Sequence, residues 1–217
     1  MKKFELTNEF ITNSYGVKLF RIKALIEFGN VKAGDLGGYI EKEENLSHMG
    51  DAWIYGDAQI SGNAQVFGDA QVFGNAWVFG DARVSGNARV SGNARVFGNA
   101  RVFGNAWVSG NARVFGDAQV FGNARVSGNA RVSGDAWVFG DARVSGDKDY
   151  AYAHGFGSCN RTTTFFRLKD GDVGVRCGCF YGTLAQFRDK VCETHGETKK
   201  AQEYLMLADL MEIRFKN

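Results

Sequence analysis

The sequence contains no proline, although glycine accounts for 29 of its 217 residues. A high glycine content suggests disorder when the residues are scattered, but these glycines recur at a fixed period between valine and phenylalanine. Such spacing is typical of an ordered repeat. Long apolar runs are also absent, since none approaches the roughly 20 residues that a membrane-spanning helix requires. Residues 1–5 have no apolar segment, so no secretion signal is predicted.

An excess of charge of one sign is also lacking. The formal net charge is only +2, which excludes a global attraction to nucleic acid or to a membrane surface. The chain contains four cysteines, and without a secretion signal these are expected to be reduced thiols. We therefore expect a cytoplasmic protein, long enough to bury a core as one large or two modest domains.

A six-residue motif fills the middle of the chain without interruption. Residues 51–146 divide into sixteen hexads of the form Asp/Asn–Ala–x–Val/Ile–Phe/Ser/Tyr–Gly. Alanine and valine lie two positions apart, so their side chains point to one side of an extended segment. The Arg, Gln or Trp between them points to the other side. Glycine followed by Asn or Asp signals a turn, because these residues tolerate positive φ angles.

A strand and a turn every six residues predict a chain that coils in one direction. Hexads are usually wound three to a coil, with about 18 residues per turn and coils about 4.8 Å apart. We predict a mainly β protein built on a single-stranded parallel β-helix, left-handed and with three strands per coil. The predicted domains are an N-terminal β cap with a first irregular coil (1–50), the β-helix (51–146) and a C-terminal α+β module (147–217).

The hexads resemble the hexapeptide-repeat acyltransferase superfamily, in which an aliphatic residue is followed four positions later by a small one. Three successive pairs follow that signature: Val84 with Ala88, Val90 with Ala94, and Val96 with Ala100. Residues 31–40, 45–47 and 50–56 are similar, more specifically, to uncharacterised acetyltransferase-like β-helix proteins of bacteria and their phages, and this similarity spans residues 15–146. The resemblance implies a phage or prophage origin and a bacterial host cell.

Enzymes of that superfamily use a histidine as general base, often beside a loop that bulges from the coils. Such a base must reach the hydroxyl or amine that it activates. The histidines of this chain are His48, His154 and His195; none lies in the hexads, and no loop interrupts them. No position here therefore takes the role of that histidine, and neither a catalytic residue nor a cofactor is predicted. A divergent acyltransferase that uses acetyl-CoA is the alternative.

Residues eighteen apart stack on the predicted prism and form outward columns. Residues 82–115 contain five arginines and no acidic residue, which makes the middle of the prism a basic belt. Phenylalanine is expected in stacks at the corners, at positions 79, 97 and 115 and at 103, 121 and 139. The predicted partner-binding belt consists of Arg83, Arg89, Arg95, Arg101, Arg113, Trp77, Trp107, Phe97 and Phe115.

Arginine beside exposed aromatic rings suits the anchoring of a protein partner or stacking on nucleic-acid bases. A self-packed surface, in which arginine stems cover the rings, is a further alternative. Like charges about 4.8 Å apart repel one another, however. The leading hypothesis is a non-enzymatic, phage-encoded interaction protein that binds a protein partner and inhibits a host defence system. Homo-oligomer formation and nucleic-acid binding through the belt remain open.

Both ends depart from the repeat. Apolar residues at every second position of 20–28 predict a strand in the N-terminal cap, which would cover the open end of the β-helix. Residues 162–168 and 173–177 are the predicted strands of a C-terminal hairpin. Thr183 with Gln186 predicts a capping box for a helix that ends near Gly196, and Thr198 opens a second helix.

Three C-terminal segments, residues 161–164, 177–180 and 194–196, resemble the C-terminal module of phage-encoded hexapeptide-repeat proteins. A possible anion pocket is predicted from Arg161, Thr162, Thr163, Thr164 and Arg176. Zinc-type ligands are also present, at Cys159, Cys177, Cys179, Cys192 and His195. A Cys-x-Cys spacing is rarer than Cys-x-x-Cys in structural zinc sites, so these are interpreted as buried thiols and no metal is predicted.

Overall fold

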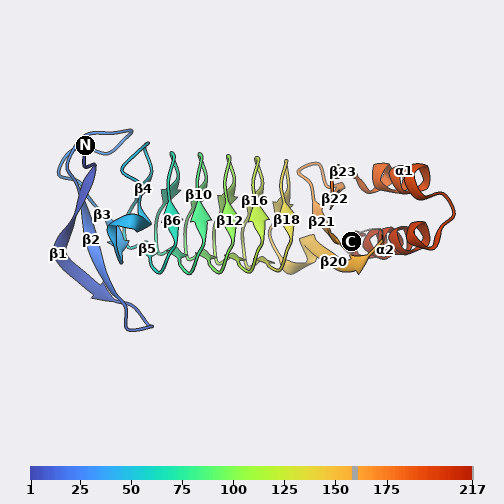
Figure 1. The fold of residues 1–217 in the computed structure, drawn as a ribbon, viewed down its shortest axis with the longest axis horizontal. Coiled ribbons are helices and arrows are strands. Elements are labelled where there is room, and N and C mark those ends of the chain that lie inside the picture. Colours follow the sequence, from blue (N-terminus) through green and yellow to red (C-terminus); the bar gives the residue numbers. More distant parts are fainter. Residues whose placement is uncertain (158–160, 217) are drawn as a thin grey trace.

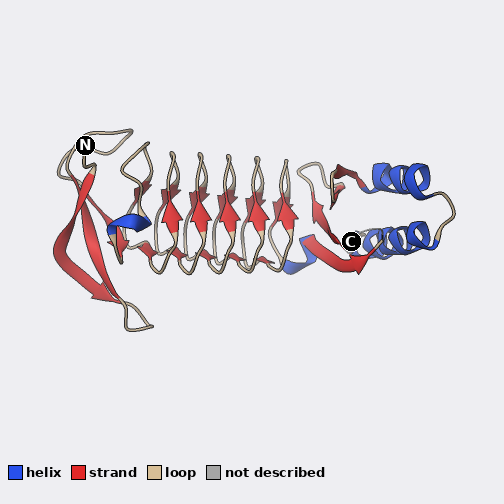
Figure 2. Cartoon of the chain, in the orientation of Figure 1, coloured by secondary structure: helices blue, strands red, loops and turns tan. Residues whose placement is uncertain are grey.

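The computed structural model describes residues 1–157 and 161–216, and the chain forms an elongated rod (Figure 1). Three parts follow one another along the rod in sequence order: a β-rich cap, a stack of coils, and a small sheet with two helices (Figure 2). The predicted fold class, mainly β with a parallel β-helix between two different ends, is confirmed.

The sixteen hexads fold as sixteen strands of two residues each, which line up on three faces of the prism. The first face contains β5 (Gln59–Ile60), β8 (Trp77–Val78), β11 (Arg95–Val96), β14 (Arg113–Val114) and β17 (Arg131–Val132). The second face contains β4 (Trp53–Ile54), β7 (Gln71–Val72), β10 (Arg89–Val90), β13 (Trp107–Val108), β16 (Arg125–Val126) and β19 (Arg143–Val144). The third face contains β6 (Gln65–Val66), β9 (Arg83–Val84), β12 (Arg101–Val102), β15 (Gln119–Val120) and β18 (Trp137–Val138).

Each short strand pairs in parallel with strands one coil away. Arg95, for example, lies opposite Trp77 in one neighbouring coil and Arg113 in the other, eighteen positions away in each direction. Three strands per coil are therefore confirmed, as are the predicted columns of outward side chains. The left-handed sense of the coils stays a prediction.

The interior of the coils is apolar and fully enclosed. The alanine and the valine or isoleucine of every hexad are buried, nearly all with no exposed surface. The long polar side chains between them lie outside, and the arginines of the middle coils are exposed. Burial of each valine contributes about 1.5–3 kcal/mol, so the stack of coils is the main source of stability.

The turns between strands require glycine. Gly98, for example, has a φ angle of 70°, and a Cβ atom built there would lie 3.1 Å from the backbone nitrogen of Gly116 in the next coil. The left-handed backbone and the close stacking of the turns both exclude a side chain.

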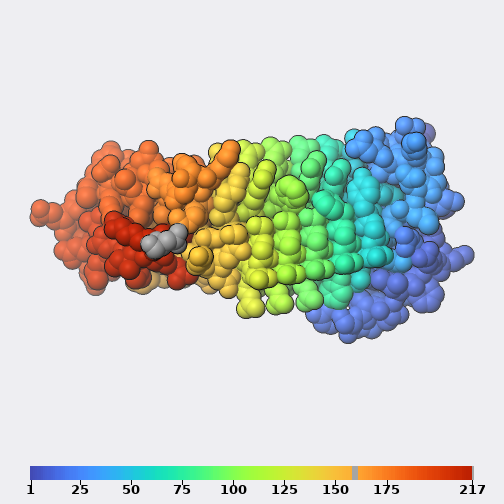
Figure 3. All heavy atoms as spheres, turned by 180° about the vertical axis from the view of Figure 1, so that it is seen from behind, coloured from blue at the N-terminus to red at the C-terminus, as the bar shows by residue number. Residues whose placement is uncertain are grey.

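The N-terminal cap extends the first face. β1 (Phe4–Thr12) and β2 (Lys18–Ala24) form an antiparallel hairpin, and β3 (Leu36–Ile40) connects this hairpin to β5. The short 3-10 helix η1 (Glu43–Asn45) follows. The strand predicted over residues 20–28 ends at Ala24, because the chain then turns to pair Phe28 with Val31. In the space-filling view the hairpin projects past the outline of the coils (Figure 3).

One predicted outward side chain is buried by this cap. Trp53 is only 1% exposed, because the rings of Phe4 and Phe28 pack against it with centroids 6.3 and 5.3 Å away. The expectation that Trp53 lies on the surface is therefore wrong. The hexad placed it outside, as predicted, but a segment distant in sequence covers it.

The C-terminal module begins with the 3-10 helix η2 (Asp147–Asp149) and contains an antiparallel sheet and two helices. The sheet order is β20 (Tyr150–Phe156), β21 (Arg161–Arg167), β22 (Val173–Cys177) and β23 (Phe180–Thr183). The helices are α1 (Leu184–His195) and α2 (Lys199–Phe215). The predicted capping box is confirmed, since Gln186 N donates to Thr183 Oγ1 and Thr183 N donates to Gln186 Oε1.

Within residues 1–157 and 161–216, no helix is both long and apolar enough to cross a membrane.

Strand β21 joins the module to the end of the rod. Phe166 belongs to the core of the coils, whereas the neighbouring Phe165 belongs to a second core beneath the helices. The sheet therefore closes the open end of the prism with one side and carries α1 and α2 on the other.

Candidate interaction surface

The predicted belt is spread over all three faces of the prism. The first face carries Trp77, Arg95 and Arg113, with Phe97 and Phe115 at its edge. The second face carries Arg89 and Trp107, and the third carries Arg83 and Arg101. A flat partner cannot contact all nine side chains at once, so the first face is the largest group of belt residues that lie together.

The first face combines a column of polar side chains with a stack of aromatic rings. The Arg95 guanidinium lies over the Trp77 ring, 5.2 Å from its centroid. Beside this column, Phe79, Phe97 and Phe115 form the predicted stack, with centroids 4.9 and 5.0 Å apart and nearly parallel planes. These three rings are half-buried, so each presents part of its surface to solvent.

The tip of the β1–β2 hairpin reaches the end of this stack. The Tyr15 ring lies 6.2 Å from the Phe79 ring and is 70% exposed. The hexad pattern gave no signal for Tyr15, because the hairpin brings it to the coils from outside the repeat. Tyr15 extends the aromatic surface of the first face toward the cap.

The second face contains a shallow groove that the predicted belt included only in part. Its lining consists of Asn87, Arg89, Asn105, Trp107, Asn123, Arg125, Asp141 and Arg143. The asparagine side chains form a ladder in which Asn87 Nδ2 donates to Asn105 Oδ1 and Asn105 Nδ2 donates to Asn123 Oδ1, at 3.4 and 3.3 Å. The sequence signal for this groove is the asparagine that recurs eighteen positions apart, at 87, 105 and 123.

Two contacts on the second face hold Trp107 in place. Its Nε1 atom donates a hydrogen bond of 3.0 Å to Ser91 Oγ, and the Arg125 guanidinium lies 5.6 Å from the ring centroid. Trp107 as a whole residue is half-buried. Part of this face is therefore self-packed, as the alternative interpretation of the arginines expects.

The third face is partly covered by the C-terminal module. Arg83 and Arg101 are exposed, but Trp137 lies beneath the Arg176 guanidinium, with 5.0 Å between guanidinium and ring centroid. The predicted second stack of Phe103, Phe121 and Phe139 forms at its edge, with centroids 4.8 Å apart. Its last ring is closed off by Tyr181 of the C-terminal sheet, 4.3 Å away between centroids.

The arginines of the coils are not neutralised by nearby acids. Among residues 1–157 and 161–216, the ion pairs within 4.0 Å involve the cap and the C-terminal module, and none includes an arginine of the coils. In the first face, Arg95 and Arg113 are also in register on neighbouring strands. Their positive charges therefore face solvent without an ion-pair partner within 4.0 Å among the described residues.

The predicted anion pocket forms only in part. Arg161, Thr162 and Arg176 line one hollow together with Trp137 at the end of the coils. Thr163 and Thr164, each 1% exposed, do not contribute. The Thr163 hydroxyl donates to Cys177 Sγ, and Thr164 Oγ1 accepts a hydrogen bond from Trp137 N. These contacts measure 3.2 and 3.1 Å. Thr163 faces the opposite side of the strand from Thr162 and Thr164, and Thr164 is buried against the end of the coils.

The described residues do not form the cluster of ligands that a zinc site requires. In the part of the chain that the structure describes, no three His, Cys, Asp or Glu side chains are close enough to hold a metal ion. Cys177 and His195 line one cavity and Cys179 lines another. Cys179 and Cys192 are exposed, so the interpretation as buried thiols is wrong for these two. Cys159 lies outside the described residues.

None of the three histidines lies in the sixteen hexads. His48 accepts a hydrogen bond of 3.1 Å from Lys3 N through Nδ1, in the cap. His154 Nδ1 lies 2.9 Å from Thr162 Oγ1 in the C-terminal sheet, and His195 ends α1. The hexads, where the acyltransferase alternative would need a base, contain no histidine.

Comparison with known proteins supports the repeat. A family model of the YdcK beta solenoid repeat matches residues 58–72, 82–96, 94–110, 106–122, 118–134 and 124–140. A comparison with curated proteins gives no match. All segments that the family model matches lie within the hexads. The resemblance to the acyltransferase superfamily therefore stays a prediction. The matched repeat and the coiled strands together identify the chain as a β-solenoid repeat protein.

Proposed function

We propose that this chain is a non-enzymatic binding protein whose first face engages a protein partner. The observation that carries the proposal is the combination of unneutralised arginines and half-buried aromatic rings on one rigid surface. Trp77, Arg95 and Arg113 stand in register one coil apart, and the stack that includes Phe97 borders them.

Such a face fits a partner surface on which carboxylates alternate with apolar side chains. Arginine binds carboxylates through two parallel hydrogen bonds, and it is enriched with tryptophan at the residues that dominate binding energy. The coils are fixed by three parallel sheets. Little conformational entropy is therefore lost when the partner binds, which favours affinity.

Occupation of a partner's surface is the mode of action that this geometry favours. The sequence resemblance to phage-encoded proteins makes a component of a host defence system the partner to seek first. Inhibition would then follow from steric blocking, since the coils themselves contain no histidine that could act as a base.

The test is affinity purification from bacterial cells that carry the gene, with the wild-type chain and two double variants. R95Q/R113Q removes two charges from the first face. R83Q/R101Q removes the same two charges from the third face, where the residues are also in register, and serves as the matched control. We expect the first variant to lose the partner and the second to keep it.

A photo-reactive phenylalanine analogue then locates the contact. Placed at Phe97 it should cross-link the partner, whereas at Phe121, in the other stack, it should not. Equal recovery of the partner with both double variants would contradict the proposal. Loss of the bound material on nuclease treatment, with affinity falling steeply as salt increases, would instead support nucleic-acid binding.

A further inference from the structure

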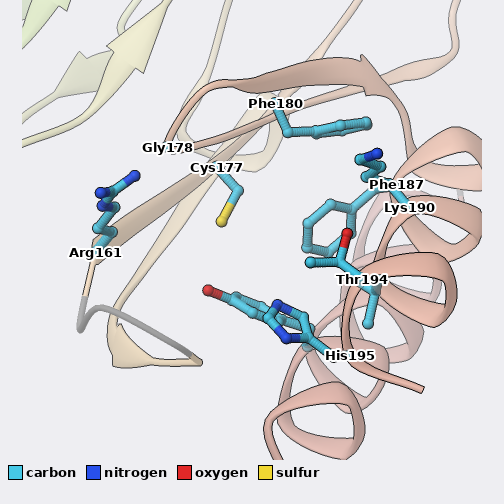
Figure 4. A pocket seen from close by; sticks show the side chains of 10 residues that line it. Arg161, Cys177, Gly178, Phe180, Phe187, Lys190, Thr194 and His195 are labelled. Atoms are coloured by element: carbon cyan, nitrogen blue, oxygen red, sulfur yellow. The ribbon is translucent and has the colours of Figure 1, made fainter.

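The C-terminal module contains a cavity that the proposed function does not use. It has a volume of about 170 Å³ and lies between the edge of the sheet and the two helices (Figure 4). Its lining consists of Arg161, Cys177, Gly178, Phe180, Phe187, Lys190, Val191, Thr194, His195 and Tyr204. All three C-terminal segments singled out by the sequence analysis, residues 161–164, 177–180 and 194–196, contribute to this lining.

The local fold explains why distant segments meet there. Cys177 pairs with Phe180 across the turn between β22 and β23, which places Gly178 in the turn with a φ angle of 56°. A Cβ atom at Gly178 would lie 2.5 Å from Arg161 Nη1. The glycine therefore lets the Arg161 guanidinium pack against the turn at the rim of the cavity.

The helices supply the opposite wall. Phe187, in the first turn of α1, is buried in the core beneath the helices. His195, the last residue of α1, stacks on the Tyr204 ring of α2 with 5.8 Å between centroids. Figure 4 shows the imidazole and the Cys177 sulfur both facing the hollow.

The lining divides into an apolar floor and a polar rim. The floor is formed by aromatic and aliphatic side chains, among them Phe180 and Val191. The rim carries Arg161 and Lys190, and no carboxylate lines the cavity in the described part of the chain. Lys190 is paired with Glu193 at 2.9 Å, whereas Arg161 has no carboxylate within 4.0 Å among the described residues.

We infer that this cavity binds a small organic monocarboxylate, with the apolar body on the floor and the carboxylate at the Arg161 guanidinium. An arginine at the edge of an apolar pocket supplies two parallel N–H donors in the geometry of a carboxylate. The volume of about 170 Å³ is close to that of an engineered cavity of about 150 Å³ that binds benzene. The body is therefore one six-membered ring or a short branched chain.

The experiment uses the full-length chain and follows backbone amide resonances by NMR during titration. The probes are benzoate, benzyl alcohol as a neutral molecule of similar shape, and inorganic phosphate as an anion without an apolar body. For a ligand of nine heavy atoms we expect a Kd of about 0.5 mM, so about 10 mM benzoate saturates the site. We expect benzoate to shift resonances of residues 177–180 and 190–195, and the other two probes to bind at least about 10-fold more weakly.

Two variants with matched controls separate the site from the fold. R161Q should weaken benzoate binding about 10-fold, the size expected for a lost charge-assisted hydrogen bond, while R176Q, in the neighbouring hollow, should leave it unchanged. G178A should displace Arg161 and weaken binding in the same way. G171A also adds a Cβ at a positive φ angle, 91°, but with no atom within 4 Å of the new Cβ, and should bind normally.

Three results would overturn the inference. One is the absence of shifts around the cavity with benzoate and, in the same titration, with isovalerate as a branched body. Another is binding of benzyl alcohol or of phosphate as tight as that of benzoate. The site would then require no negative charge on the ligand, or no apolar body. The third is full benzoate affinity in R161Q, since the carboxylate would then be held elsewhere. None of these outcomes bears on the partner of the first face.

Discussion

Arg113 lies between two other arginines of the first face, so its removal should raise the free energy of unfolding. It is in register with Arg95 on one side and Arg131 on the other. No ion pair within 4.0 Å offsets these charges among the described residues. The substitution R113Q removes the central charge and keeps a long polar side chain.

The magnitude follows from the coil spacing. Two unit charges about 5 Å apart in a water-like dielectric repel by about 0.8 kcal/mol. Arg113 has two such neighbours, whereas Arg101 lies between Arg83 and Gln119 and has only one. We assign about half of this energy to relaxation of the exposed guanidinium groups, so R113Q should stabilise the protein by about 0.8 kcal/mol and R101Q by about 0.4 kcal/mol.

Urea unfolding at two ionic strengths measures the effect. The difference between the variants should be present at about 0.01 M salt, where the Debye length is about 30 Å, and should vanish at about 1 M, where it is about 3 Å. If R113Q is instead less stable than R101Q at low salt, the reasoning is refuted. In that case the aliphatic part of each arginine stabilises the fold by covering the aromatic rings, and the repulsion between the charges does not lower the free energy of unfolding.

Three further predictions concern the fold. V96A should lower the free energy of unfolding by about 2 kcal/mol in urea titrations, because Val96 is fully buried and the coils cannot collapse around the space. G98A should lower the melting temperature more than G16A does; both sites have positive φ, but only Gly98 has backbone of the next coil 3.1 Å from the added Cβ. Burial lowers the pKa of Lys3 to about 8 from an ordinary value of 10.5, so above pH 8 the unfolded chain holds more protons and stability should rise with pH. Urea titrations between about pH 7 and 9.5 should show this rise in the wild type and not in K3M; higher pH is avoided because burial raises the pKa of Tyr150, which reverses the trend.

The repeat could be derived from the sequence because the residues of each hexad determine its local structure. Val96 and Ala94 point inward, Gly98 turns the chain, and the same signals recur in every coil, so local pattern and global fold agree. The stacking of Phe97 on Phe115 followed from the eighteen-residue coil alone. Nothing outside the repeat was needed for these predictions.

The ends could not be derived in the same way, because their contacts join residues that share no period. Trp53 has the hexad position of Trp77, yet only Trp53 is covered by Phe4 and Phe28. Likewise, the threonines of β21 were grouped by composition, whereas alternation along the strand sends Thr164 toward the coils. The site at the C-terminal end therefore had to be read from the structure.

The uniform coil makes the length of the rod independent of its ends. Duplication or loss of an eighteen-residue unit in the gene would add or remove one rung from every column and about 4.8 Å of length, while the β1–β2 hairpin and the C-terminal sheet would meet the same coil edges as before. Recombination among the chain's own near-identical repeats is thus a route by which the length of the rod could change without new contacts at its ends.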